Sequence, residues 1–191
     1  MFALRFLAGD YSWEPVSWCT ATHLGRELEV DFAALHRGED EHRQVAQTLL
    51  LGEAKSFNRF EERDVSRLHA LRRRFPEATL VAATLRPSLD ADERAALRAL
   101  SQPPVRRPSD VSRGGRLIVL TGLELFHRGD PPECWDDIEG SVGRLVDQMR
   151  YSRPTVRMWA DVTAMLHLGA EPHDVWARAQ LERLRDEHER R

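Results

Sequence analysis

The stretch Val45-Ala-Gln-Thr-Leu-Leu-Leu-Gly-Glu-Ala-Lys55 decides which fold this chain adopts. Its centre, Leu49-Leu50-Leu51, is apolar at consecutive positions, a pattern typical of a strand that is buried on both faces. Its end carries Glu53 and Lys55, which share one face of the strand because side chains two residues apart point the same way. Charges at the end of so apolar a strand need a partner or a function, because burying an unpaired charge is costly.

The segments around this strand alternate between strand and helix patterns. Two predicted strands precede it, at residues 16–23 and 27–35, and the short spacing between them favours a hairpin or meander. The predicted elements after it are a helix at 60–75, a strand at 78–85, a helix at about 90–100, a strand at 117–121, a helical turn at 123–126, and helices at 155–168 and 174–188. The stretches 102–115 and 128–137 are rich in proline, glycine or charge and are expected to be loops. This order predicts an α/β fold with a mixed β-sheet.

Composition sets the broad class of protein. With 191 residues, 41% of them apolar, the chain fits a single domain. No apolar run approaches the roughly 18–20 residues of a membrane span, and the N-terminus lacks the layout of a signal peptide, so we expect a cytoplasmic protein without membrane contact. The two cysteines are too few for a disulfide framework or a zinc site. A net charge of −3 gives no general basic field for nucleic acid, although it allows a local basic patch.

Lys55 is the only lysine among 28 basic residues. Arginine serves most surface roles of lysine, but it cannot replace a compact ammonium where one is needed. If the strands at 27–35 and 45–55 pair as an antiparallel hairpin, Asp31 meets Glu53 across it. Two carboxylates and the backbone carbonyl of Ala54 are hard oxygen ligands suited to Mg²⁺, and a neighbouring lysine could stabilise charge on a phosphate. A bare scaffold in which Glu53 and Lys55 form an ion pair would give the same pattern.

The segments Glu-Leu-Glu-Val-Asp31-Phe-Ala-Ala-Leu and Leu-Leu-Leu-Gly-Glu53-Ala-Lys55-Ser-Phe resemble the PD-(D/E)xK nuclease superfamily. The resemblance implies a restriction-endonuclease-like core at about 16–121, with a central mixed sheet flanked by helices, and a C-terminal helical extension at about 122–191. It further implies that Asp31 and Glu53 bind Mg²⁺, with Mn²⁺ able to substitute, and that Lys55 aids the attacking water. The activity expected is hydrolysis of DNA phosphodiester bonds in restriction, repair or recombination.

Two features depart from the superfamily pattern. Val30, not proline, precedes Asp31. Many members carry a further glutamate on a helix before the first strand, and Glu14 is the only nearby upstream acid here. Either this fourth ligand is absent, or the natural protein begins further upstream and a preceding segment supplies it.

Other residues near the motif are candidate DNA contacts. Ser56, Arg63 and Arg67 could meet phosphates, although Glu61, Glu62 and Asp64 partly neutralise this helix, so a solvated charged face is the competing interpretation. Glu29 could support the metal from outside or be an ordinary exposed strand charge. The alternative function is a catalytically inactive nuclease-fold module that binds DNA or a partner protein. A homodimer or an upstream targeting domain is also open.

Overall fold

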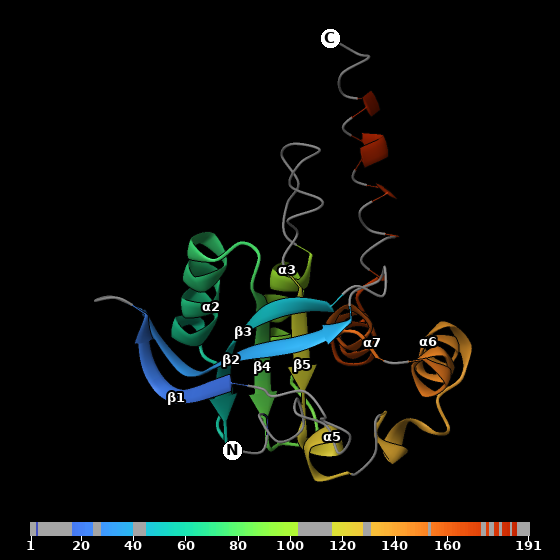
Figure 1. Cartoon of the computed structure of the whole chain (residues 1–191), viewed down its shortest axis with the longest axis horizontal. Helices are drawn as coiled ribbons and strands as arrows, with labels where there is room; N and C mark the ends of the chain where they lie inside the picture. Colours follow the sequence, from blue (N-terminus) through green and yellow to red (C-terminus); the bar gives the residue numbers. More distant parts are fainter. Residues whose placement is uncertain are drawn as a thin grey trace.

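The computed structural model describes residues 3, 17–24, 28–39, 45–102, 116–127, 131–152, 154–172, 175, 178–179, 181–183 and 185–186. These residues form a mixed β-sheet with helices on one face and along one edge (Figure 1). The strands are β1 Ser17–Leu24, β2 Leu28–Glu39, β3 Val45–Lys55, β4 Thr79–Thr84 and β5 Leu117–Leu120. The helices are α2 Glu62–Arg74, α3 Ala91–Ser101, α5 Gly122–Phe126, the 3₁₀ turn η1 Glu133–Trp135, α6 Gly140–Tyr151 and α7 Val156–Leu168.

The sheet has five strands in the order β1-β2-β3-β4-β5. The pairs β1–β2 and β2–β3 are antiparallel, whereas β3–β4 and β4–β5 are parallel. Parallel neighbours need a long crossover, and α2 and α3 provide the two crossovers from β3 to β4 and from β4 to β5. The predicted α/β class with a mixed sheet is thus confirmed.

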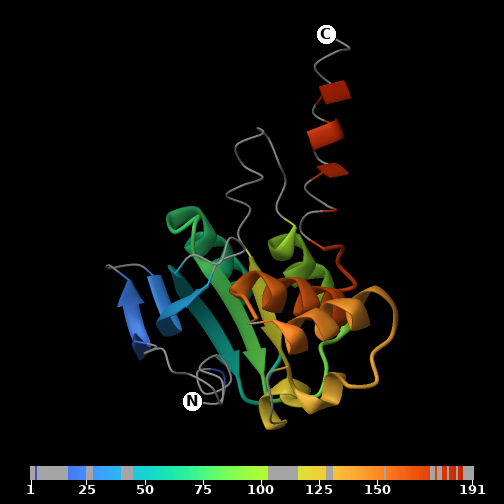
Figure 2. The same ribbon diagram turned by 45° about the vertical axis from the view of Figure 1, so that its right-hand side comes forward.

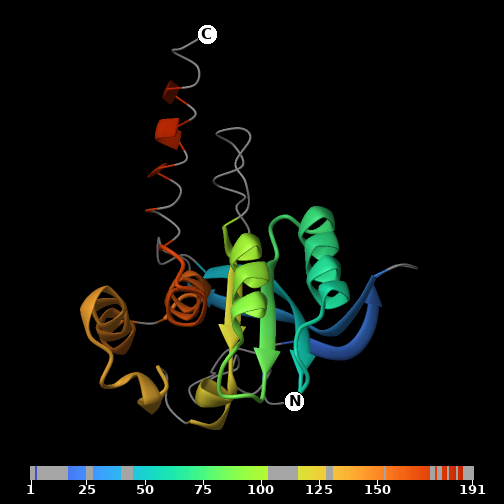
Figure 3. The ribbon, with the colours of Figure 1, turned by 180° about the vertical axis from the view of Figure 1, so that it is seen from behind.

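The core lies on both faces of the parallel half of the sheet. Helices α2 and α3 lie side by side on one face (Figure 3). The apolar residues buried between these helices and the sheet include Leu51, Leu68, Leu71, Leu80, Leu97, Leu100 and Val119. A second cluster on the opposite face includes Phe32, Leu50, Val81, Ile118, Leu120 and Ala160. Strands buried on both faces explain the continuous apolar runs in the sequence.

Helix α7 packs along β5 at the edge of the sheet, and α6 packs on α7 away from the sheet (Figure 2). A third apolar cluster, built on Trp135, Val146, Met149 and Val162, joins these two helices to η1. None of the described helices is long and apolar enough to cross a membrane.

Two expectations from the sequence differ from the structure. Strand β2 continues to Glu39 instead of ending at residue 35, because its last residues still pair with the start of β3. Helix α6 was not predicted, because its glycines are poor helix formers. One of them, Gly143, is buried at a position where a Cβ would lie 2.2 Å from the carbonyl oxygen of Ile138. Residues 103–115 and most of the predicted helix 174–188 lie outside the described residues, and those described from the latter are helical.

Candidate functional site

The register of β2 against β3 brings Asp31 beside Glu53. The paired register ends at Phe32 opposite Gly52, so Asp31 and Glu53 are the next residues on the two strands. At this point a side chain of β2 takes over from its backbone as the hydrogen-bond acceptor for β3: Oδ2 of Asp31 accepts a hydrogen bond of 2.7 Å from the backbone N–H of Ala54. Glycine at position 52 permits this register, since a Cβ there would lie 1.9 Å from the ring of Phe32. The structure therefore places the two acids side by side, as the hairpin predicts.

Glu53 and Lys55 meet in a largely buried ion pair. The Nζ atom of Lys55 lies 2.9 Å from Oε1 of Glu53, whose side chain is only 1% exposed. The side chain of Lys55 is 18% exposed, so its ammonium lies at the border between the core and solvent. Ala54 between them is exposed. An ammonium that contacts both a buried carboxylate and solvent can either stabilise the fold or take part in catalysis.

Helix α2 adds Asp64, which the sequence did not assign to the site, and Arg67, which the sequence offered only as a DNA contact. Oδ1 of Asp64 lies 2.9 Å from Nζ of Lys55, so the ammonium bridges two buried carboxylates. Nη1 of Arg67 lies 2.8 Å and 3.0 Å from the two oxygens of Glu53. Asp64 and Arg67 are three residues apart and so lie on one face of the helix. The prediction of a solvated face does not hold for Arg67, because its guanidinium contacts the buried acid of β3.

Asp64 also fixes the start of α2. Its Oδ2 accepts a hydrogen bond of 2.9 Å from the backbone N–H of Glu61, which completes a capping box at the first turn. Each oxygen of Asp64 therefore has a separate role, one in the helix cap and one toward Lys55. The capping pattern in the sequence is the signal that could have singled out Asp64, although not its bond to Lys55.

Burial and charge set the ionisation of this cluster. Burial raises the pKa of the Glu53 carboxyl above its usual value, and the charge of Asp31 adds to the rise, while the neighbouring cations offset only part of it. Burial alone would lower the pKa of the Lys55 ammonium, but its hydrogen bonds to Glu53 and Asp64 outweigh it and the pKa is raised. Burial would likewise raise the pKa of Asp64, yet the backbone bond at the helix cap and the bond from Lys55 bring it below its usual value.

The oxygen donors at this point fit Mg²⁺ in type. Asp31 and Glu53 contribute carboxylates, and the carbonyl of Ala54 points to the same side of β3 as its N–H, which faces Asp31. Among the described residues no three His, Cys, Asp or Glu side chains form a metal-holding group. Mg²⁺ commonly uses one or two carboxylates and fills its octahedron with water and substrate phosphate, so this donor set is sufficient. Both oxygens of Glu53, however, are held by cations of the protein.

The remaining candidates are more peripheral. Ser56 follows Lys55 in an exposed bend, and the side chain of Arg63 is 74% exposed and paired with Glu61. Glu29 is exposed on β2. Glu14, the candidate fourth ligand, lies outside the described residues. The two arginines proposed as phosphate contacts, Arg63 and Arg67, are thus each paired with an acid of the chain.

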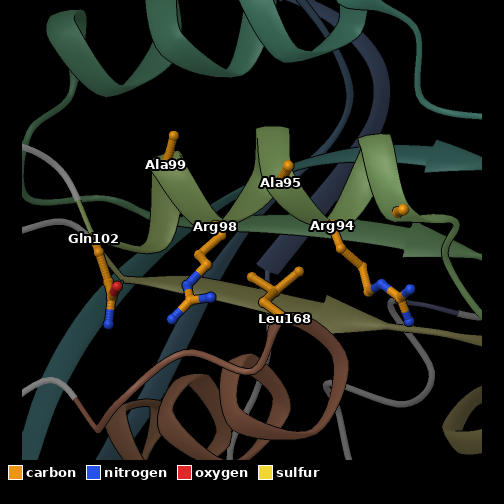
Figure 4. A pocket seen from close by; sticks show the side chains of 7 residues that line it. Arg94, Ala95, Arg98, Ala99, Gln102 and Leu168 are labelled. Carbon is orange, nitrogen blue, oxygen red and sulfur yellow. The ribbon is translucent and has the colours of Figure 1, made fainter.

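Two further features lie away from this cluster. Glu124 of α5 is buried and accepts hydrogen bonds from Thr121 and from Trp135 Nε1, and it lies 2.9 Å from Nε2 of His167, so it joins α5, η1 and α7. A groove between α3 and α7 is lined in part by Arg94, Arg98 and Leu168 (Figure 4). Neither feature includes a residue of the predicted site.

The chain is therefore an α/β protein with a carboxylate–lysine cluster where β2, β3 and α2 meet. Comparison of the chain with protein-family models, with curated proteins and with solved structures finds no match. The function has to be argued from the site itself.

Proposed function

We propose that this chain is a divalent-metal-dependent nuclease that hydrolyses DNA, with a restriction-endonuclease-like core and action in the cytoplasm. The observation that carries the proposal is the convergence of Asp31, Glu53 and the only lysine of the chain at the junction of β2 and β3. A buried acid with a raised pKa, a second acid beside it and a lysine at the solvent border are typical of a functional site.

The residues divide the work by their chemistry. Asp31 and Glu53, with the carbonyl of Ala54, would hold Mg²⁺ or Mn²⁺. The bound cation supplies Lewis-acid polarisation of a phosphoryl oxygen and of water. Lys55 is a protonated donor in the cluster, so it would orient the attacking water or stabilise charge on the phosphate instead of removing a proton. Asp64 holds the ammonium from the side of α2, and its bond together with that to Glu53 leaves one of the three ammonium hydrogens for water or phosphate.

A closed ion network favours a second candidate function. Both oxygens of Glu53 are bonded to Lys55 or Arg67, which is what a purely structural cluster would show. On that basis the chain would be a catalytically inactive module of the same fold that binds DNA or a partner protein.

Cleavage assays separate the two functions. Single-stranded, duplex and branched DNA are incubated with Mg²⁺ or Mn²⁺ and the wild type, Asp31→Asn, Glu53→Gln or Lys55→Met. The proposed nuclease loses at least about 100-fold of its activity in each variant. Glu29→Gln is the matched control, because it removes an exposed acid two residues from Asp31 on the same strand, and it should retain activity. Absence of cleavage by the wild type on all three substrates, with DNA still bound, would favour the inactive module.

A further inference from the structure

Arg67 occupies the carboxylate that a metal ion would need. Its Nη1 contacts both oxygens of Glu53, and Lys55 contacts one of them as well. The side chain of Glu53 is 1% exposed, so no other face of this carboxylate is open to solvent. A cation that binds Glu53 must therefore replace a contact with one of the two basic residues.

Of the two, Arg67 is the group that can leave. Lys55 is tied to a second acid, Asp64, at 2.9 Å, whereas among the described residues Arg67 is bonded to Glu53 and to no other acid. The side chain of Arg67 is also the more exposed, at 27% against 18% for Lys55. A long arginine on a helix face can swing its guanidinium into water while its stem stays packed.

Charge balance points the same way. With Asp31, Glu53 and Asp64 ionised, and Lys55 and Arg67 protonated, the cluster carries one net negative charge. Without the guanidinium it carries two, which matches a divalent cation. The displaced guanidinium would remain next to the metal and would suit a phosphate oxygen, since its planar fork matches phosphate geometry.

We infer that Arg67 is a built-in competitor for the divalent cation: the guanidinium and the metal ion bind Glu53 in exchange for one another. This inference rests on the proposed metal-dependent function and adds to it the residue that regulates loading of the site. The apparent affinity for the metal is reduced by the fraction of molecules in which Arg67 has left Glu53. If that fraction is about one in ten, removing the guanidinium strengthens metal binding roughly tenfold.

The test measures Mn²⁺ binding directly. Titration calorimetry at pH 8 gives the dissociation constant of Mn²⁺ for the wild type, Arg67→Met, Arg67→Lys and Arg63→Met. Met keeps most of the apolar stem and loses the charge. Arg63→Met is the matched control, because it removes a charge from the same helix at an exposed position that pairs with Glu61 at 2.9 Å and reaches the cluster only at 4.0 Å, at Oδ1 of Asp64. We expect binding about tenfold tighter for Arg67→Met, a smaller gain for Arg67→Lys and no change for Arg63→Met.

Thermal unfolding with EDTA and with Mn²⁺ separates this role from a structural one. A merely structural arginine would lower the melting temperature equally in both buffers, whereas a competitor makes the stabilisation by Mn²⁺ larger in Arg67→Met than in the wild type. If Arg67→Met does not fold, Arg67→Lys decides by the same comparison. Equal Mn²⁺ affinity in wild type and variant overturns the inference and leaves the metal site standing. Absence of Mn²⁺ binding in all the proteins overturns the inference and the proposed function together.

Discussion

Replacing Gly52 by alanine tests the strand register on which the site depends. A Cβ at position 52 would lie 1.9, 2.1 and 2.6 Å from three ring atoms of Phe32, which is itself buried. Real Cβ contacts of this length do not occur, so the ring must move. Overpacking of this kind costs about 1–3 kcal/mol, and the lower backbone entropy of alanine returns about 0.5–1 kcal/mol. We expect Gly52→Ala to lower the free energy of unfolding by roughly 1 kcal/mol, or the melting temperature by about 2–4 °C.

A double-mutant cycle identifies the cause. Phe32→Leu alone leaves a small cavity and destabilises by roughly 1–2 kcal/mol, but it also removes the ring atoms that alanine would meet. Urea unfolding of both single variants and the double variant should give a coupling of at least about 1 kcal/mol, with the double variant more stable than the sum predicts. Gly169→Ala is the control, because nothing lies within 4 Å of its added Cβ and its cost comes from the left-handed backbone at φ 58°. Additivity of Gly52→Ala and Phe32→Leu within about 0.5 kcal/mol would refute the register, and with it the placement of Asp31 beside Glu53.

Three further predictions follow from the buried ionisable groups. Asp64→Asn should lower the free energy of unfolding by about 2 kcal/mol at pH 7, because Lys55 and the cap of α2 must share one remaining oxygen. The pKa of Asp64 is lowered in the folded protein, so the wild type loses the stability that this carboxylate contributes as it is protonated below about pH 4. The difference between wild type and variant should therefore shrink at low pH. Glu124 has its pKa lowered to about 2, so stability should fall between about pH 4.5 and 2 as it is protonated, and this fall should be smaller in Glu124→Gln as measured by urea unfolding at each pH. Burial first, and then the charge of Glu124, raises the pKa of Cys134 to about 11, so little of its reactive thiolate is present at pH 8. In a Cys19→Ser background, the thiol of Cys134 should therefore react with a disulfide reagent at pH 8 far more slowly in the native than in the unfolded protein.

The core strands could be predicted because the residues of each strand show by themselves that it is buried. β3 and β4 are covered on both faces, and each shows an unbroken apolar run that no exposed segment would keep. Helix α6 could not be predicted in the same way. Gly140 and Gly143 lower its intrinsic helix propensity, and Gly143 leaves room for the carbonyl of Ile138 just before the helix. What compensates is tertiary, because Val146 and Met149 fill the cluster with α7.

The site shows the same division between local and tertiary information. Glu53 and Lys55 could be singled out because their spacing fixes them on one face of one strand, and Asp31 because a hairpin is a short-range pairing. Asp64 and Arg67 lie in a helix that reads as a solvated charged face. Their contacts depend on how α2 crosses the sheet on its way from β3 to β4, which periodicity does not encode. The spacing of charged residues along a helix shows which of them share a face, but it does not show whether that face points to water or into the core.

The position of the only lysine becomes intelligible once its partners are known. The ammonium of Lys55 accommodates two buried carboxylates, Glu53 and Asp64, each at 2.9 Å, from a slot that is mostly closed to solvent. An ammonium can do this because it is a compact charge with three donors that rotate about one bond, whereas a guanidinium is a wide planar fork. Arg67 fills the opposite role, since its fork spans the two oxygens of one acid. In this arginine-rich chain the lysine therefore stands at a point where two buried acids on different elements, Glu53 and Asp64, share a single compact charge, and that point lies beside Asp31.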